Sequence, residues 1–497
     1  MSTNTDPRLI NRRNFLKAAG VVSAGSIAGL GSLRMLQKVS AHPLAARLLA
    51  SKPIKEQHVG FTDGWVSMPL EAAPRPPFWP DPGAPDKRNA YAFGIRNLMT
   101  PSDPNNPSNL WKPMSESMMF AQKGHAQLSA PLLFADQGSD FRLHLHNLGE
   151  QQRPVGNPDN HTIHFHGFTN QIVYFDGVPD NSVAAAIGRE LIYHYFPEDP
   201  GSYMYHCHID DVEHVHMGLY GIIWIRSTQM SGPQGQRAAF NDPLDPVTHA
   251  NLLPLEQQSW YDREFASIIT EFDVHAHWND AHNQDTDWSE YNGAFRLMNG
   301  RAYPDTVQRH LDPMFTGDYG ALERLRSNPN SSLIQGNAGE RIMVRISNLG
   351  FEEHSLLLPG IPLTVVGRDA KPLFANRIDY GVDWSEPSIA GSVQSGSRGN
   401  IQWTSNRVDL GPGESRDMII TLPSTNQTAG GHDVYPFYDR NYGTRLASSS
   451  DGVGGMRTEV HVYPKGTLLP QTRPAGLYIP NGSGGWTETW APGTEPV

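Results

Sequence analysis

The chain of 497 residues has a single cysteine, Cys207, so it cannot form an internal disulfide. Beyond the first forty residues it also lacks any apolar run long enough to span a bilayer, so we expect no membrane insertion. Basic residues are scarce relative to acidic ones. The formal net charge is -12, and without residues 1–41 it is -17. This balance argues against nucleic acid and anionic membrane surfaces as partners.

The overall composition is that of a folded protein rich in turns. Hydrophobic residues make up 38% and charged residues 18%, which excludes a disordered chain. The 47 glycines and 40 prolines favour an all-β fold, and few segments show helical periodicity. The length fits two or three domains.

The first 41 residues are predicted to be a targeting segment. Residues 11–17, Asn-Arg-Arg-Asn-Phe-Leu-Lys, resemble a twin-arginine signal, and a weakly apolar stretch, 18–33, follows. Val39-Ser-Ala41 is a plausible cleavage site. We therefore expect export by the twin-arginine route, to the periplasm or the outside of the cell.

Metal-ligating side chains gather in two segments. The cysteine lies in Tyr203-Met-Tyr-His-Cys-His208, and about forty residues upstream is His161-Thr-Ile-His-Phe-His-Gly167. His214 and Met217 follow the cysteine. Thiolate, imidazole and thioether together are the ligands of a blue-copper site. The alternative is a buried free cysteine among ordinary strand histidines, but the number and spacing of these ligands favour copper.

The chain contains an internal repeat. Residues 138–149 match 339–350, residues 161–167 match 354–360, and residues 204–208 match 434–438. The second copy lacks the metal ligands. In this alignment the positions of His164, His166, His206, Cys207 and His208 are taken by Leu357, Pro359, Pro436, Phe437 and Tyr438. The repeat predicts two β-sandwich domains of one type, of which only the first binds metal.

These motifs resemble those of the multicopper oxidase family, in a form built from two cupredoxin domains. The resemblance rests on His164-Phe-His-Gly167, Asp176-Gly-Val-Pro179 and Pro200-Gly-Ser-Tyr-Met-Tyr-His-Cys-His208, and a further family-like run begins at Tyr291. It implies an all-β fold of two cupredoxin-like Greek-key β-sandwich domains. We expect a copper-binding domain at 58–228, a degenerate one at 259–465 and an extended tail at 466–497.

Strand parity sorts the ligands into two sets, because successive side chains point to opposite faces. One set contains Cys207 and His161, completed by His214 and Met217 from the following loop, and would form the blue-copper site. The other set lies on the opposite face and resembles half of the family's trinuclear copper cluster. It consists of His164, His166, His206 and His208. Cys207 and its neighbours would carry electrons between the two centres.

The first site departs from the family pattern in its spacing. His214 lies seven residues after Cys207, farther than is usual, and Met217 precedes Gly218 instead of following it. Met217 is the favoured axial ligand. If it does not bind, Leu219 leaves the axial position empty and His216 competes with His214.

The second centre is short of histidines. The family's trinuclear cluster draws equal sets from two facing domains, and this chain offers one set of four. Two other groups could stand in, both with strand-like spacing: His144 with His146, and His275 with His277 and His282. Whether the centre is mononuclear or trinuclear stays open. Two-domain relatives form it between subunits, so we expect a homo-oligomer, with a trimer as the form suggested by relatives.

The predicted function is an exported copper-dependent oxidoreductase that couples one-electron oxidation of a small-molecule or metal-ion reductant to reduction of O2. Two alternatives are a copper nitrite-reductase-like enzyme and a non-enzymatic copper-binding or electron-transfer protein. Nitrite reductases place an acid where this chain has His164, and they lack a counterpart of His208. Asp176, Asp210 and Asp211 are candidate proton donors, or simply loop and turn residues.

Overall fold

The structure is a computed structural model. It describes residues 54–495, apart from 70–76, 104–109, 153–158, 169–171, 243, 246, 249, 252, 374–401, 429 and 442–453. The predicted signal peptide, 1–41, lies outside the described residues. Among the residues described, no helix is long and apolar enough to cross a membrane.

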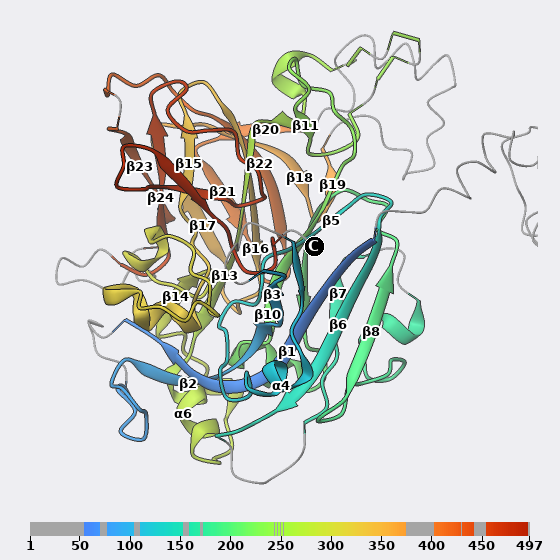
Figure 1. Ribbon diagram of the computed structural model, residues 1–497, viewed down its shortest axis with the longest axis vertical. Coiled ribbons are helices and arrows are strands. Elements are labelled where there is room, and N and C mark those ends of the chain that lie inside the picture. The colour runs from blue at the N-terminus through green and yellow to red at the C-terminus, as the bar shows by residue number, and fades with distance from the viewer. Residues whose placement is uncertain are drawn as a thin grey trace, which may run out of the picture. The chain divides into compact units, whose positions relative to one another are not determined.

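The first half of the chain forms two four-stranded sheets, with orders β2-β1-β6-β8 and β5-β10-β9-β7 (Figure 1). Apolar side chains from both sheets fill one core, which includes Leu143, Leu145 and Cys207. Their strands are β1 (Ile54–Ser67), β2 (Asn89–Asn97), β5 (Leu133–Asp136), β6 (Asp140–Gly149), β7 (His164–His166), β8 (Glu190–Tyr195), β9 (Gly201–His206) and β10 (Tyr220–Arg226).

The second half forms a seven-stranded sheet, β14-β13-β16-β22-β18-β19 with β20 paired to β18, and a five-stranded sheet, β15-β24-β23-β17-β21. A separate apolar core fills the space between them. Their strands are β13 (Arg263–Phe272), β14 (Phe295–Met298), β15 (Ile334–Asn337), β16 (Arg341–Asn348), β17 (His354–Leu357), β18 (Leu363–Arg368), β19 (Lys371–Pro372), β20 (Trp403–Ser405), β21 (Arg407–Leu410), β22 (Ser415–Thr421), β23 (Asp433–Asp439) and β24 (Arg457–Tyr463).

Shorter elements join and flank these sheets. The remaining strands are β3 (Met99–Pro101), β4 (Trp111–Pro113), β11 (Arg237–Ala238), β12 (Trp260–Tyr261), β25 (Leu477–Pro480) and β26 (Trp486–Thr489). The α-helices are α4 (Glu116–Phe120), α5 (Asp211–Met217) and α6 (Val274–Ala281). The 3-10 helices are η1 (Val173–Phe175), η2 (Leu255–Gln257), η3 (Trp288–Glu290), η4 (Asp305–Val307) and η5 (Gly320–Ser327).

The two halves share one strand topology, which supports the repeat found in the sequence. In the first half β1 pairs in parallel with β6, and β5 with β10. In the second half β13 pairs in parallel with β16, and β15 with β24. The turn that ends β6 also recurs: Asn147 accepts from the N–H of Gly149, and Asn348 from that of Gly350. The all-β prediction is confirmed, whereas the predicted domain boundaries stay a prediction.

Buried polar contacts connect the two halves. The Ser202 hydroxyl donates to Asp417 Oδ1 over 2.5 Å. Arg345 lies 2.9 Å from the same carboxylate and 3.3 Å from Glu264, and its side chain is fully buried. Because Ser202 lies on β9, this network fixes the strand that ends at His206 against the second half.

The last thirty residues, predicted as an extended tail, contain the hairpin β25–β26 and then return to the first half. The N–H of Leu132 donates to the carbonyl of Pro492 over 2.8 Å. Asn97 donates to the Glu495 carboxylate over 2.6 Å. Pro492 accordingly lies beside the residue that precedes β5, a strand labelled in Figure 1.

Candidate metal centres

Cys207 lies directly after β9, at the centre of a compact set of ligating atoms. Its side chain is fully buried. The sulfur lies 3.3 Å from His214 Nδ1 and 3.7 Å from His161 Nδ1. These three residues form one group whose ligand atoms could hold a single metal ion. Separations of this size are those expected between ligands that share one ion.

A short helix, not the expected loop, brings His214 to the sulfur. Between Cys207 and Gly218 lies α5, which begins at Asp211 and ends at Met217. Gly218 has φ +124°, a conformation that favours glycine, and the N–H of Cys207 bonds the carbonyl of Leu219 over 3.1 Å. The wide spacing between Cys207 and His214 is therefore explained by α5. After this helix the chain comes back to Cys207, at the end of β9.

The structure separates the two histidines that competed for this site. His214 faces Cys207, whereas His216 accepts a hydrogen bond from the N–H of Asp273 over 3.2 Å. Met217 is fully buried in the same core as Cys207. Its role as axial ligand stays a prediction.

Burial keeps two ligands of this site, His161 and Cys207, uncharged. It lowers the pKa of His161 well below its ordinary value, so the imidazole is neutral and can donate a lone pair. Burial also raises the pKa of Cys207 to about 11. The thiol would thus keep its proton until a metal cation displaced it.

The four other motif histidines gather on the opposite side of the same strands. His164 and His166 lie on β7, His206 ends β9, and His164 stands directly opposite His206 in the strand pairing. The ring centre of His164 is 5.3 Å from that of His206 and 5.2 Å from that of His208. Strand alternation thus places Cys207 and its two neighbours on opposite faces, as parity predicts.

Backbone carbonyls orient two of these rings. His164 Nδ1 donates to the carbonyl of Asp176 over 2.6 Å, and His206 Nδ1 donates to that of Cys207 over 2.7 Å. Each bond leaves Nε2 with its lone pair available. Burial lowers the pKa of His164, and that of His206 to about 3, so both are neutral at neutral pH.

Two of the three candidate proton donors lie beside this face. Asp211 Oδ2 is 4.0 Å from His208 Nδ1, and Asp176 Oδ1 is 3.7 Å from His164 Nδ1. Asp210 instead occupies the N-cap of α5, with φ +43°. Asp176 and Asp211 therefore stay candidates, whereas the position of Asp210 is that of a turn residue.

The second half borders the four histidines without adding a ligand from the aligned positions. A side-chain carbon built on Gly413 would lie 3.6 Å from His166 Cε1. The pairing of β17 with β23 also corrects our sequence alignment. Leu357 stands opposite Tyr438, so Tyr438, and not Pro436, is the counterpart of His206.

The corrected alignment places Asp439 at the position of Cys207. The N–H of Asp439 bonds the carbonyl of Met456, just as the N–H of Cys207 bonds that of Leu219. Phe437, which we had aligned with Cys207, instead occupies the core position of Tyr205. The error was two residues, and a slip of two leaves every side chain on its own face of the strand, so parity could not reveal it.

The histidines proposed as stand-ins lie elsewhere. His275 and His277 were expected on a strand, but they belong to α6. His277 Nδ1 donates to the carbonyl of Tyr91 over 2.6 Å, and His282 lies 3.2 Å from Asp81. His144 and His146 are on β6 and contact His58, away from the four-histidine face.

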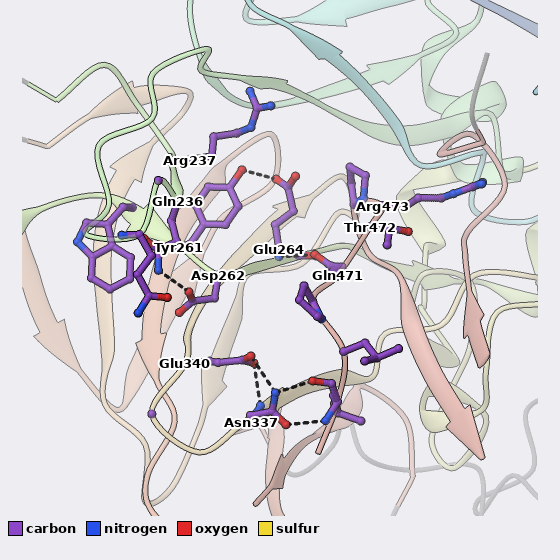
Figure 2. Close-up of a pocket in the computed structure, with 18 of the residues that line it drawn as sticks. Gln236, Arg237, Tyr261, Asp262, Glu264, Asn337, Glu340, Gln471, Thr472 and Arg473 are labelled. Atoms are coloured by element: carbon purple, nitrogen blue, oxygen red, sulfur yellow. Dashed lines mark hydrogen bonds between the residues drawn. The ribbon is translucent and has the colours of Figure 1, made fainter. Parts of the chain in front are cut away.

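A cavity of about 860 Å³ lies at the linker between the halves, and sequence reasoning missed it (Figure 2). Polar side chains that line this cavity form hydrogen bonds with one another. Tyr261 donates to Glu264 over 3.1 Å, and Gln236 donates to Asp262 over 3.0 Å. None of the predicted metal ligands lines it, so it is separate from both candidate centres.

Comparisons with known proteins point to one family. Residues 98–229 match the family model described as multicopper oxidase. "Multicopper oxidase MCE" of Talaromyces pinophilus is 32% identical over 104 residues, which is 20% of this chain and 16% of that protein. The match thus spans a small part of that relative. The resemblance to multicopper oxidases stated from the motifs is confirmed.

Solved structures of similar proteins include a blue copper oxidase from Nitrosomonas europaea, with a TM-score of 0.47 at 16% identity, covering 82% of this chain and 86% of that one. The multicopper oxidase mgLAC has a TM-score of 0.49 at 14% identity, covering 84% and 89%. A copper nitrite reductase from Nitrosomonas europaea has a TM-score of 0.44 at 15% identity, covering 84% and 96%.

Proposed function

We propose that this chain is an exported copper-dependent oxidoreductase of the multicopper oxidase type. It would take single electrons from a reductant at the Cys207 centre and deliver them to O2 at the four-histidine centre. One observation carries the proposal. Cys207 contacts His161 and His214 on one side, while its neighbours His206 and His208 join the second cluster on the other.

The donor set at Cys207 fits copper. A thiolate with two imidazoles, completed by a weak thioether from Met217, is the ligand set of blue-copper sites. Copper bound there would supply one-electron redox chemistry. The protein's part is to hold the three strong ligands together in a core from which water is excluded, since both Cys207 and Met217 are fully buried.

The two centres are joined by a short piece of backbone. The bond from His206 Nδ1 to the carbonyl of Cys207 ties one ligand of the second centre to the main chain of the first. Besides this hydrogen bond, the peptide bonds that join Cys207 to His206 and His208 give a covalent route between the two centres. Asp176 and Asp211, beside His164 and His208, would return the protons that reduction of O2 consumes.

The four motif histidines, His164, His166, His206 and His208, would hold the second copper centre. His164 and His206 would use Nε2, since Nδ1 of each bonds a carbonyl. Gly413 comes close to His166, so the second half covers part of this face without the histidines that a complete trinuclear cluster needs. We therefore propose a type 2 or type 2/3 centre, of which the type 2/3 form would be completed by a neighbouring subunit. The type 2/3 form thus requires a homo-oligomer, and relatives suggest a trimer.

Copper stoichiometry and the visible spectrum test the function. Protein loaded with copper is expected to be blue, to bind at least two coppers per chain and to consume O2 with a phenol or a reduced metal ion. Cys207→Ser should abolish the colour and the oxidase activity. His282→Gln, a histidine paired with Asp81 outside both centres, is the control. Oxidase activity that survives Cys207→Ser would rule the proposal out.

The same preparation separates the two alternatives. Release of nitric oxide from nitrite without O2 consumption would favour a nitrite-reductase-like enzyme. One copper per chain with neither activity would favour electron transfer. The close packing of His164 and His208, two positions that differ in nitrite reductases, supports the oxidase.

A further inference from the structure

Three histidines and two glutamates cluster on the outer face of the β1–β6–β8 sheet. His58 lies on β1 opposite His144 of β6, and His146 of β6 lies opposite Glu190 of β8. Glu56 lies two residues before His58 on β1. The alternating residues Leu143 and Leu145 point into the core that holds Cys207. The cluster therefore lies on the other side of the sheet from the blue-copper site.

The ligating atoms of this cluster converge in two overlapping groups. In the first, Glu56 Oε1 lies 3.2 Å from His58 Nε2 and 3.3 Å from His144 Nε2. In the second, His146 Nε2 lies 3.0 Å from His58 Nδ1 and 3.5 Å from Glu190 Oε1. His144 Nδ1 joins the two groups through a contact of 2.5 Å to Glu190.

The cluster has more close contacts than N–H groups that could make hydrogen bonds across them. A neutral imidazole carries one N–H, so the three rings supply three protons to five contacts. If His144 donates to Glu190 from Nδ1, its Nε2 lone pair faces the Glu56 carboxylate. A cation bound within one of the two groups would remove that repulsion, because each ligand of that group could then direct a lone pair at it.

We propose that this cluster binds one divalent transition-metal ion of the zinc or copper class. Imidazole with carboxylate is a donor set that suits Zn2+ and Cu2+. In a tetrahedral zinc site, ligand atoms about 2.0–2.1 Å from the ion are about 3.3 Å from one another. The contacts of 3.0 to 3.5 Å within the two groups match that spacing.

The surroundings of the cluster favour ligation. The side chain of His58 is 8% exposed and that of His144 is 11% exposed, while the glutamates, near 40%, open to solvent. An ion can therefore enter from the surface. Burial lowers the pKa of His58 to about 4 and also lowers that of His146, so both rings are neutral at neutral pH. The stacked rings of His58 and His144, 3.9 Å apart, hold the ligands in place.

Zinc uptake by the full chain without added copper, compared between the wild type and a cluster variant, tests this site, because copper would otherwise fill the cluster first. Wild-type protein is equilibrated with Zn2+ and bound metal is counted per chain. We expect one zinc more than in the double variant His58→Gln/His146→Gln, with affinity at least tenfold tighter, because His58 belongs to both groups. His194→Gln is the matched control, because His194 lies on the same face of β8 but bonds Asp140 outside the cluster. It should bind zinc as the wild type does.

A second measurement needs no variant. Modification of histidines by diethyl pyrocarbonate, mapped by mass spectrometry, should fall at His58, His144 and His146 when Zn2+ is present and stay unchanged at His194. Equal zinc uptake by the wild type and the double variant would overturn the proposal. So would modification of His146 that zinc does not change. Either result would mean that these side chains only bond one another and hold no metal.

Discussion

His354 bears the same relation to Asp439 in the second half that His161 bears to Cys207 in the first. His354 Nδ1 lies 2.5 Å from Asp439 Oδ2, and its Nε2 contacts Glu271. All three side chains are fully buried. Where the first half has a thiol and a neutral imidazole, the second has an imidazolium between two carboxylates. In the second half, an ion pair thus occupies the position that the proposed blue-copper site has in the first half.

The His354 ion pairs predict a pH-dependent stability. They raise the pKa of His354 to about 9, against about 6.5 in an unfolded chain. The ion pairs of His354 therefore stabilise the fold fully below about pH 6.5, and this stabilisation is lost as the pH rises through about 9. The shift corresponds to about 3 kcal/mol. Free energies of unfolding at pH 6 and pH 10 should show this loss in the wild type and not in His354→Gln.

The carboxylates of this group act at the other end of the pH scale. Hydrogen bonds and ion pairs with His354 lower the pKa of Glu271 and Asp439. The stability that these carboxylates contribute is fully present above their pKa values in the unfolded chain. It is lost as the pH falls through their lower pKa values in the folded chain. His282→Gln should keep the full pH dependence of the wild type. A His354→Gln variant with an unchanged pH profile would contradict the ion-pair assignment.

The two histidines of α5 should differ sharply on substitution. His214→Gln removes a ligand next to the sulfur, so we expect the thiolate-to-copper absorption to be lost. His216→Gln leaves that site intact but breaks the bond from Asp273, so its colour should stay while stability falls by about 1–3 kcal/mol. Absorption spectra with denaturant unfolding check both. A colourless His216→Gln with normal copper content would show that the assignment is wrong.

The axial position can be tested through the reduction potential. If Met217 is the weak axial ligand, Met217→Leu should raise the potential of the blue centre and leave its copper content unchanged. Met204→Leu, another buried methionine of the same half, is the control for packing. The potential is measured by redox titration of the visible band. Equal potentials in both variants and the wild type would mean that Met217 does not bind copper.

The contact between the halves depends on a buried ion pair. Arg345 and Asp417 are fully buried, 2.9 Å apart. Asp417→Asn should lower the free energy of unfolding by about 3–5 kcal/mol, because it leaves a buried charge poorly paired. Asp409→Asn breaks the half-exposed pair with Arg407 and should cost at most about 1 kcal/mol. Denaturant unfolding of both variants makes the comparison.

Strand alternation predicted the site better than it predicted the chain between the ligands. It separated Cys207 from His206 and His208, because a period of two is fixed by the backbone. It did not predict α5, because the segment from His208 to Met217 has no strong helical pattern. The helix is stabilised by the packing of its last residues in the core. The same limit applies to His275 and His277, whose spacing fits a strand although tertiary packing places them on a helix.

Long-range contacts were beyond sequence reasoning for a different reason. His58 carries no motif, and its approach to His144 and His146 comes from the parallel pairing of β1 with β6. Similarly, the alignment of the second copy was wrong by two residues because only the hydrogen bonds of β23 fix its register. The alternation within a strand determines which face of the sheet a side chain lies on. The pairing with another strand determines which side chains lie next to it.

The return of the chain's last residues to the first half bears on when the copper sites mature. Asn97 and Leu132 obtain partners from residues 492–495, so the sandwich that carries every proposed copper ligand lacks these contacts while the ribosome is still translating. We therefore expect the first half to be less stable, and its proposed copper ligands less firmly held, until the C-terminal residues have been synthesised.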